Sequence, residues 1–309
     1  MNLVTGATLP ATAVAFPEEF EAAAYRGQNE GIAHLNDLEL RFHYEAHGKT
    51  EGRRCSRVAD RASFLSCVPR GLEILEIGPF WAPAFRRPEH RVWYVDVLDR
   101  EALQKKAAND PNSRGAMVPD IDFIWKGEPY RALTGREFDV VFSSHNVEHQ
   151  PDLVAHLEDV ASVLRPGGLF LLVIPDKRYC FDHFIPETTI AQVIEAHVYR
   201  RRQHSLATLL TDRLMHTHNN SAEHWAGQHG RDPRFPVEER QALVRRVMTD
   251  CLGASDYVDA HAWQFTPDSF RSVSSELRSL DMTCLDSLRV YQTSFNSFEF
   301  YAVLGKSGW

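Results

Sequence analysis

Leu72-Glu73-Ile74-Leu75-Glu76-Ile77-Gly78-Pro79-Phe80-Trp81 is the stretch that decides the fold. Its apolar residues form a short and nearly continuous run, which is typical of a strand buried in a parallel sheet. Ligands of doubly wound α/β sheets bind just beyond the carboxyl ends of such strands, and Glu76 and Gly78 stand at that end. A second apolar run, 92–96, ends at Asp96, where an acid can accept hydrogen bonds from ribose hydroxyls. The two runs predict an α/β sheet that binds a nucleoside.

The loop after the first strand indicates which nucleoside is bound. A dinucleotide fold requires G-x-G-x-x-G, whose backbone N–H groups hold a pyrophosphate. This loop has one glycine, and Pro79 and Pro83 have no N–H to donate. S-adenosylmethionine (SAM) carries no phosphate and requires a close backbone approach, an acceptor for its amino group and a partner for its ribose. Gly78, Glu76 and Asp96 meet these requirements, so SAM is the expected cofactor.

The order of motifs along the chain resembles that of the class I SAM-dependent methyltransferases. In these enzymes the first strand ends in E/D-x-G and the second in an acid, as at Glu76-Ile77-Gly78 and Asp96. The segment 138–149 resembles their F-D-x-V-x-x-x-x-x-x-E-H signature, and Leu164-Arg165-Pro166-Gly167-Gly168 before an apolar strand is a further hallmark. Together the motifs cover about residues 72–176, and the departure is the missing second and third glycines of the family's loop.

The resemblance implies a doubly wound, seven-stranded Rossmann-like sheet with helices on both faces. We expect an N-terminal helical segment over 1–69 and a methyltransferase domain over 70–309, with a helical insertion or lid at about 177–260. The expected strands are 72–77, 92–96, 122–125, 138–145, 169–175 and the closing antiparallel pair 282–292 and 298–304. The expected helices are 18–25, 36–48, 56–67, 100–109, 152–164, 190–210, 238–252 and 268–280, with a capping box at Asn36 and Glu39.

Composition excludes several other classes of protein. The net charge of −8 over 309 residues argues against a nucleic-acid binder. The sequence contains no apolar run of transmembrane length and no basic, apolar signal segment at its start. Five cysteines are scattered without a C-x-x-C pair, which favours reduced thiols and a cytoplasmic location. A small-molecule or saccharide acceptor is the expected partner, and a homodimer remains open.

The resemblance also implies a set of cofactor-binding residues. Residues just past the third strand flank the adenine in the methyltransferases, and here they are Trp125 and Lys126, although Trp125 could equally belong to the core. The end of the fourth strand adds two further candidates beside the donor. The full set is Glu76, Gly78, Pro79, Phe80, Asp96, Trp125, Lys126, Ser144 and His145.

The candidates for chemistry lie after the fourth strand and in the insertion. An alcohol acceptor must lose its proton near the transition state, and a histidine of near-neutral pKa suits that role. The candidate bases are His149 first, then His261 and His183, with Asp182 to orient one of them. The insertion leaves the carboxyl end of the fifth strand, so Arg178, Tyr179 and His224 are expected to bind the acceptor. The alternative for each histidine is a hydrogen bond to a backbone carbonyl or a helix end.

No catalytic metal is expected, but two ligand sets remain as alternatives. Carboxylates and histidines at Asp176, Asp182, His145, Glu148 and His149 could hold Mg²⁺. His216, His218 and His224 could bind Zn²⁺, although they lack a fixed four-ligand spacing.

The segment 176–183, D-K-R-Y-x-F-D-H, resembles methyltransferases associated with bacterial polysaccharide clusters. We therefore expect O-methylation of a sugar or another small hydroxylated acceptor. The alternatives are N- or C-methylation of a natural-product scaffold, or a non-catalytic subunit of a carbohydrate-modifying complex that docks through its first 70 residues. A nicotinamide-dependent oxidoreductase is disfavoured by the single glycine after the first strand.

Overall fold

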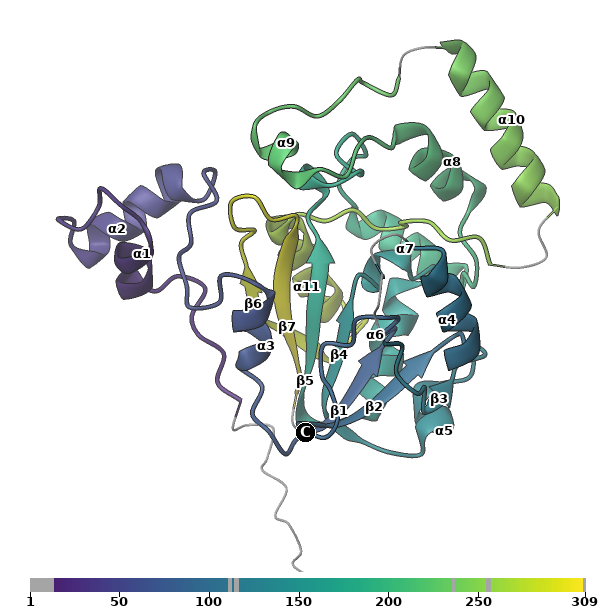
Figure 1. The fold of residues 1–309 in the computed structure, drawn as a ribbon, viewed down its shortest axis with the longest axis horizontal. Coiled ribbons are helices and arrows are strands. Elements are labelled where there is room, and N and C mark those ends of the chain that lie inside the picture. The colour runs from purple at the N-terminus through teal and green to yellow at the C-terminus, as the bar shows by residue number, and fades with distance from the viewer. Residues whose placement is uncertain (1–13, 111–112, 114–116, 235–236, 254–256, 308–309) are drawn as a thin grey trace, which may run out of the picture.

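A seven-stranded sheet of order β3-β2-β1-β4-β5-β7-β6 forms the centre of the molecule (Figure 1). The computed structural model describes residues 14–110, 113, 117–234, 237–253 and 257–307, and in helix α10 the side chains of 237 and 250–253 lie outside the description. The strands are β1 (Glu73–Ile77), β2 (Arg91–Asp96), β3 (Phe123–Ile124), β4 (Phe138–Ser144), β5 (Leu164–Pro175), β6 (Leu285–Tyr291) and β7 (Glu299–Lys306). Strands β1 to β5 are parallel, whereas β7 runs antiparallel to both β5 and β6, which confirms the predicted sheet.

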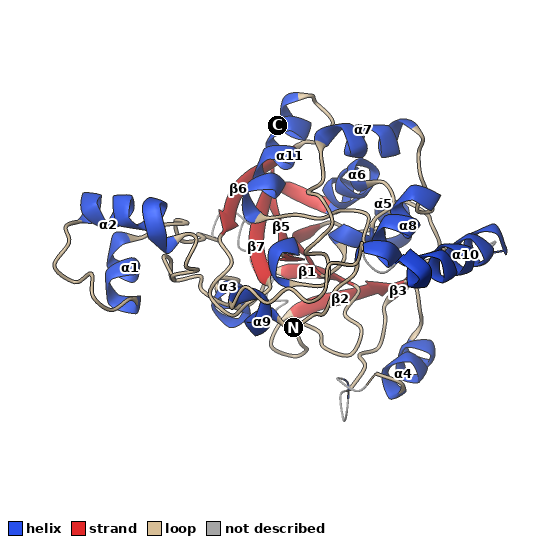
Figure 2. Ribbon diagram, turned by 90° about the horizontal axis from the view of Figure 1, so that it is seen from above, coloured by secondary structure: helices blue, strands red, loops and turns tan. Residues whose placement is uncertain are grey.

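Helices cover both faces of this sheet. Their bounds are α1 (Ala22–Gln28), α2 (Asp37–His43), α3 (Arg61–Ser66), α4 (Arg100–Ala108), α5 (Tyr130–Thr134), α6 (Leu153–Val163), α7 (Ile190–Val198), α8 (Leu206–Met215), α9 (Ser221–Trp225), α10 (Val237–Gly253) and α11 (Pro267–Ser279). In the view from above, α6, α7 and α11 lie on one side of the strands, and α3 and α4 lie on the other (Figure 2). Among the described residues, no helix has the length and apolar character needed to span a membrane.

Alternation along the strands explains why both faces are covered. Successive side chains of a strand point to opposite faces, so an apolar run supplies two cores at once. Leu75 packs in the core beneath α6 and α11, whereas its neighbour Ile74 packs with Phe64 of α3 in the core on the other face. Both β1 side chains are fully buried. Because β1, β2 and β4 are parallel, their carboxyl ends meet at one edge of the sheet, where a ligand site is expected.

The N-terminal helices lie to one side of the sheet (Figure 1). The capping box predicted at Asn36 and Glu39 is present at the start of α2. Helix α1, in contrast, begins four residues later than predicted. Glu19 lies before it and accepts a hydrogen bond from the backbone N–H of Val290 (2.7 Å), so a tertiary contact holds this segment in a non-helical conformation. The sequence also predicts a loose leader over 1–16, of which residues 1–13 lie outside the described residues.

The insertion after β5 is helical, as predicted, but its first helix is divided. The structure has α7 and α8 where one helix was predicted over 190–210. The chain turns at Arg200, whose φ is +46°, and Ser205 caps α8 by accepting from the backbone N–H of Thr208 (3.0 Å). A serine whose side chain accepts a hydrogen bond from the backbone N–H two or three residues later favours the start of a helix over its interior. Helices α8, α9 and α10 lie beyond the carboxyl ends of the parallel strands (Figure 1).

The end of α6 also differs from the prediction. Residues 165–168, predicted as a helix stop before the fifth strand, already belong to β5 because Leu164 pairs with Phe138 of β4. The predicted closing elements are confirmed: α11 follows a capping box between Thr266 and Ser269, and β6 and β7 form the antiparallel edge. Cys55, Cys67, Cys180 and Cys284 are free thiols, and the side chain of Cys251 lies outside the described residues.

Candidate active site

The loop after β1 opens toward free space at the carboxyl end of the sheet. Gly78 has φ +66°, a conformation that favours glycine, and its backbone N–H donates to the carbonyl of Val95 (2.9 Å). A Cβ built on Gly78 would have only the Nδ2 of Asn146 within 4 Å, at 3.7 Å. Phe80, two residues on, also has a positive φ of +43°. This turn leaves room for a ligand to approach the backbone closely.

Glu76 is buried beneath this loop and binds the loop itself. One carboxylate oxygen accepts from the backbone N–H of Ala84 (2.7 Å) and the other accepts from that of Phe85 (3.0 Å). Burial raises the pKa of Glu76 to about 7, although both hydrogen bonds act in the opposite direction. Both oxygens have backbone partners, so Glu76 shapes the loop. Each carboxylate oxygen can accept a further hydrogen bond, and the role of Glu76 as an acceptor for the amino group of the cofactor stays a prediction.

Asp96 lies at the end of β2, beside the end of β1. Its Oδ1 accepts from the backbone N–H of Leu98 (3.0 Å), and burial raises its pKa. Lys106 of α4 interacts favourably with this carboxylate and also lies over the ring of Phe80, 5.2 Å from the centroid. Lys106 was not predicted as a site residue, since a lysine within a polar helix carries no signal of its own.

Trp125 and Lys126 follow β3 next to Asp96. The backbone N–H of Trp125 donates to the carbonyl of Asp96 (2.9 Å), which places this turn at the predicted edge. The indole Nε1 donates to the carbonyl of Glu128 (2.7 Å), and the ring packs against the main core near Tyr130. Part of the Trp125 side chain therefore packs against the core, whereas Lys126 is exposed.

Ser144 and His145 end β4 and contact residues of other segments. The Oγ of Ser144 accepts from the guanidinium of Arg61 (3.0 Å), and Arg61 also pairs with Glu299 of β7. His145 has φ +48°, and its Nε2 lies 2.8 Å from Oε1 of Glu299. Burial opposes ionisation of Glu299, but the hydrogen bond from His145 and the charge of Arg61 together lower its pKa. These contacts tie the end of β4 to β7.

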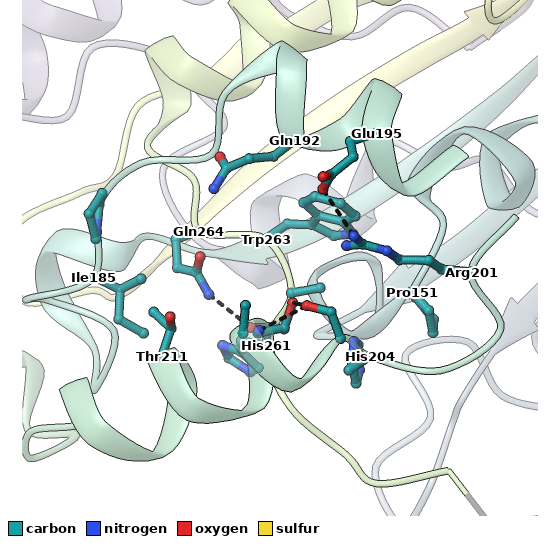
Figure 3. Close-up of a pocket in the computed structure, with 15 residues that line it drawn as sticks. Pro151, Ile185, Gln192, Glu195, Arg201, His204, Thr211, His261, Trp263 and Gln264 are labelled. Atoms are coloured by element: carbon teal, nitrogen blue, oxygen red, sulfur yellow. Dashed lines mark hydrogen bonds and ion pairs between the residues drawn. The ribbon is translucent and has the colours of Figure 1, made fainter. Parts of the chain in front are cut away.

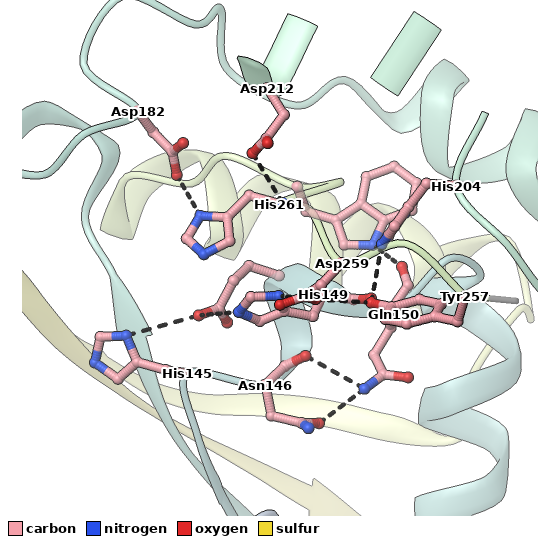
Figure 4. A network of polar contacts seen from close by, with 12 residues as sticks. His145, Asn146, His149, Gln150, Asp182, His204, Asp212, Tyr257, Asp259 and His261 are labelled. Atoms are coloured by element: carbon pink, nitrogen blue, oxygen red, sulfur yellow. Dashed lines mark hydrogen bonds and ion pairs between the residues drawn. The ribbon is translucent and has the colours of Figure 1, made fainter. Parts of the chain in front are cut away.

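A buried carboxylate lies beside His145 and His149, which belong to the polar network of Figure 4. Glu148 is fully buried, and neither of its carboxylate oxygens has a hydrogen-bond partner among the residues that the structure describes. Two ring nitrogens lie near Oε1: Nδ1 of His145 at 3.7 Å and Nε2 of His149 at 3.8 Å. An unpaired buried carboxylate is costly, so a group bound between these side chains would satisfy it.

His149 is oriented by an acid from the end of the insertion. Its Nδ1 lies 2.8 Å from Oδ1 of Asp259, and the same oxygen accepts from the hydroxyl of Tyr257 (3.0 Å). The hydrogen bond to His149 lowers the pKa of Asp259, so this side chain is a carboxylate that accepts. Neutral His149 therefore carries its proton on Nδ1, and the lone pair on Nε2 faces the space beside Glu148.

His261 is a buried cation. Its Nδ1 lies 2.6 Å from Oδ2 of Asp182, and its ring meets that of His149 edge-on at 4.5 Å. Burial opposes protonation, but the hydrogen bond and charge of Asp182, with the charges of Glu148 and Asp212, raise the pKa of His261 to about 9. At neutral pH His261 is therefore protonated, which makes it unsuited to the general-base role suggested by the sequence.

The remaining predicted residues lie in two other groups. Arg178 donates to both oxygens of the buried Asp176 (2.9 and 2.6 Å), which also accepts from the hydroxyl of Thr293 (2.6 Å), so this guanidinium already has a carboxylate partner. Tyr179 stacks on Trp225 at 3.8 Å with an interplanar angle of 8°.

His183 stacks on His229 at 3.7 Å and lies beside His224, in a cluster separate from His149 and His261. Of the alternative Mg²⁺ ligands, Glu148 and His149 lie together, and with His261 they offer ligand atoms within 4.8 Å of one another. Asp176 instead pairs with Arg178. His216 pairs with Asp212, which separates it from the group of His224.

A cavity of about 260 Å³ lies beneath the insertion, next to His261 (Figure 3). Its lining comes from 151, from 185–211 and from 261–264, so it adjoins the histidine pair and does not include the cofactor loop. Polar side chains are frequent in this lining: Gln192, Glu195, Arg201, Thr208, Thr211 and Gln264. These residues were not predicted, because their polarity resembles that of any solvated helix until the fold turns them inward.

The sheet order, the open turn at Gly78 and the acid that ends β2 define a Rossmann-like, SAM-dependent methyltransferase of class I. Residues 48–243 match the family model described as a methyltransferase domain, which is more than half of the chain, and the protein belongs to this family. SAM is accordingly its cofactor. No curated protein matches the chain.

Several solved methyltransferase structures are distantly similar. The CcbJ methyltransferase from Streptomyces caelestis is 14% identical over 94% of this chain and 97% of its own, with a TM-score of 0.40. The magnesium protoporphyrin IX methyltransferase ChlM from Synechocystis PCC 6803, solved with bound SAM, is 12% identical over 89% of this chain and 99% of its own, with a TM-score of 0.37. The CurJ carbon methyltransferase is 13% identical over 77% of this chain, with a TM-score of 0.36, and the match spans 49% of that chain. At these TM-scores the structures add nothing to the family assignment.

Proposed function

We propose that the chain transfers the methyl group of SAM to a hydroxyl of a sugar or another small, polar acceptor. The observation that carries this proposal is the pair formed by His149 and Asp259, with Nδ1 and Oδ1 2.8 Å apart. A histidine held by a carboxylate in this way presents a lone pair on its other nitrogen, as a general base requires.

The cofactor would lie across the ends of β1, β2 and β4. In the proposed arrangement the turn at Gly78 allows close backbone approach, with Pro79 and Phe80 beside it, and Asp96 accepts from the ribose hydroxyls. Trp125 and Lys126 would flank the adenine. The chain at 144–145 would lie beside the methionine part of the donor, while Glu76 keeps the loop in shape through Ala84 and Phe85.

Methyl transfer from a sulfonium is a direct displacement. The acceptor oxygen forms its bond to the methyl carbon as the carbon–sulfur bond breaks, and the electron pair of that bond leaves with S-adenosylhomocysteine. We propose that the hydroxyl proton passes to Nε2 of His149, which becomes an imidazolium. Asp259 at 2.8 Å and Glu148 at 3.8 Å then stabilise its positive charge.

His261 has a different role in this proposal. A second positive charge beside His149 would oppose proton transfer unless a negative charge compensated it. Asp182 pairs with His261 at 2.6 Å, and Glu148 lies within the same cluster. Asp182 and Glu148 thus compensate the positive charge of His261, whose ring packs edge-on against that of His149.

The cavity next to His261 supports a hydroxylated acceptor. Amide, hydroxyl and charged side chains can donate to and accept from hydroxyl groups in several directions. An acceptor in this cavity would contact Gln192, Thr211 and Gln264 and reach His149 past His261. Methylation of nitrogen or carbon remains the competing chemistry and would not require the base.

The decisive experiment measures transfer from isotope-labelled SAM to a panel of sugars and small polyols, with product masses, for wild type and His149→Gln. We expect methylated product from wild type, and a loss of about 10² to 10⁴-fold in the variant without loss of S-adenosylhomocysteine binding. His34→Gln, on an exposed turn of the N-terminal segment, is the matched control. Full activity of His149→Gln would refute the proposed base. Products methylated only on nitrogen or carbon would refute the proposed acceptor class.

Three broader expectations also stand as proposals. The chain would act in the cytoplasm, where the four described free cysteines remain thiols. The segment 1–69 would be a helical appendage to a methyltransferase domain over 70–309. Self-association as a homodimer is testable by light scattering.

A further inference from the structure

Three histidines from two segments of the chain meet beyond the end of β5, in a cluster separate from that of His149. His183 follows β5, His224 lies on α9, and His229 lies in the loop after α9. The rings of His183 and His229 stack at 3.7 Å, and Nδ1 of His224 lies 3.0 Å from Nδ1 of His229. Each of the three offers one ring nitrogen within 4.8 Å of the others.

Backbone carbonyls determine which nitrogen of two rings carries the proton. Nδ1 of His183 lies 2.8 Å from the carbonyl of Arg178, and Nε2 of His224 lies 3.0 Å from the carbonyl of His218. A carbonyl can only accept, so these nitrogens must be N–H groups. The lone pairs therefore lie on Nε2 of His183 and Nδ1 of His224. Metal-binding histidines characteristically donate their other N–H to a carbonyl in this way.

The contact between His224 and His229 follows from this assignment. Nδ1 of His224 must accept, so Nδ1 of His229 donates to it when no ion is present. A proton in this position can move to the other nitrogen of His229, which frees a second lone pair toward the same point.

The neighbouring His218 provides a natural contrast. Its ring stacks on His224 at 4.2 Å, so it belongs to the same group of rings. However, its Nε2 lies 3.0 Å from the carbonyl of Gln228, and its Nδ1 accepts from the backbone N–H of Asn220 (3.2 Å). Both nitrogens are thus occupied by the backbone, and His218 has no lone pair left for an ion.

We propose that His183, His224 and His229 bind one divalent transition-metal ion of the zinc class, with a fourth position left for water. Zn–N bonds of about 2.0–2.1 Å in a tetrahedral site place neighbouring nitrogens about 3.3 Å apart. Nδ1 of His224 and Nδ1 of His229 lie 3.0 Å apart, and the stacked rings of His183 and His229 must turn to aim their nitrogens at one ion. Three imidazoles without a carboxylate favour zinc over Mg²⁺ or Ca²⁺, which prefer oxygen ligands.

Such an ion would fasten the insertion to the sheet. His183 stands eight residues after Pro175, the last residue of β5, whereas His224 lies on α9 and His229 in the loop that follows it. The stack of Tyr179 on Trp225 joins the same two segments. A metal bridge would therefore hold α9 over the end of β5 in addition to this aromatic contact.

The test uses the full chain, freed of metal by a chelator and dialysed against Zn²⁺, with metal content measured per chain. Cobalt is the second probe, because tetrahedral Co²⁺ gives visible absorption bands. We expect one tight ion in wild type and in the matched control His218→Ala. We expect at least 100-fold weaker binding in His224→Ala and His229→Ala. Far-ultraviolet circular dichroism and S-adenosylhomocysteine binding check that each variant is folded.

His149→Gln separates this site from the cluster of Glu148, His149 and His261, which could also take a cation. Retention of the tight ion in His149→Gln supports the proposal, and its loss there would assign the ion to the other cluster. Absence of zinc from wild type at micromolar free Zn²⁺, or unchanged binding in His229→Ala, would overturn the proposal. If His224→Ala does not fold, His229→Ala decides alone, since His229 lies in a loop.

Discussion

Oδ2 of Asp182 lies 2.6 Å from Nδ1 of His261, although 79 positions separate the two residues in the sequence. The contact forms because the two ends of the insertion run side by side: Asp176 and Phe265 form a parallel bridge, and the backbone N–H of Lys177 donates to the carbonyl of Phe265 (2.9 Å). Both partners of the ion pair are buried. The insertion is thus closed at its base by a charged pair that also adjoins His149.

This ion pair predicts a pH dependence of stability. The pKa of His261 is raised to about 9 in the folded chain, against an ordinary value near 6.5. Its contribution is therefore complete below about pH 6.5 and is lost as the pH rises through about 9. The free energy of unfolding, measured with urea between pH 6 and pH 10, should fall across this window in wild type.

Asp182→Asn should flatten that dependence, because the charge that raises the pKa of His261 is removed. It should also lower stability at pH 6. Asp120→Asn, which changes an exposed carboxylate paired with Arg100, should keep the wild-type profile. Equal slopes in wild type and Asp182→Asn would show that another group titrates in this window.

Asp259→Asn tests the orientation of the proposed base. The amide cannot stabilise an imidazolium as a carboxylate does, so kcat should fall by about 10²-fold or more. Affinity for S-adenosylhomocysteine should change less than about threefold, because Asp259 acts through His149. An unaltered kcat would remove Asp259 from the mechanism.

Asp96→Ala tests the cofactor site by titration calorimetry with S-adenosylhomocysteine. Hydrogen bonds to a charged group contribute about 1.5–3 kcal/mol, so affinity should fall by roughly 10- to 150-fold. Asp120→Ala, an exposed acid elsewhere on this side of the sheet, is the control and should bind as wild type does. Undiminished binding to Asp96→Ala would mean that the ribose has another partner.

Gly78→Ala tests the turn after β1, with Gly71→Ala as a matched control. Both glycines have positive φ, +66° and +95°, and a Cβ at either meets no atom closer than 3.7 Å. Each substitution should therefore lower the free energy of unfolding by about 1 kcal/mol through backbone strain alone. Only Gly78→Ala should also weaken S-adenosylhomocysteine binding, since Gly71 precedes β1 and lies at its amino end, opposite the proposed cofactor site. Equal affinity in the two variants would contradict close backbone approach at Gly78.

Local signals predicted most of the elements. The apolar runs of β1, β4 and β5 are long enough to identify buried strands, and the capping residues Asn36 and Thr266 mark helix starts through contacts with the next few residues. Predictions failed where distant residues compete with local preference. Glu19 accepts hydrogen bonds from Val290 and Arg271, and these contacts keep it out of the first turn of α1. The chain also turns at Arg200, within a segment of helical composition.

The sequence by itself determined the class of protein, because motif order and the ends of apolar strands depend only on neighbours along the chain. It placed Gly78 and Asp96 at one edge of the sheet and His149 just after β4. Only the tertiary structure decided which groups are paired. Hydrogen bonds and burial set the charge of a side chain, and both depend on partners brought from distant segments.

The same reason explains the outcome for individual site residues. Glu76 is bound by its own loop, Arg178 is occupied by Asp176, and Asp182 makes His261 a cation. His183, predicted as a possible base, joins His224 and His229 instead, because the insertion folds α9 back over the end of β5. Residue type and spacing name the candidates for chemistry, whereas the fold assigns each of them a partner and therefore a protonation state.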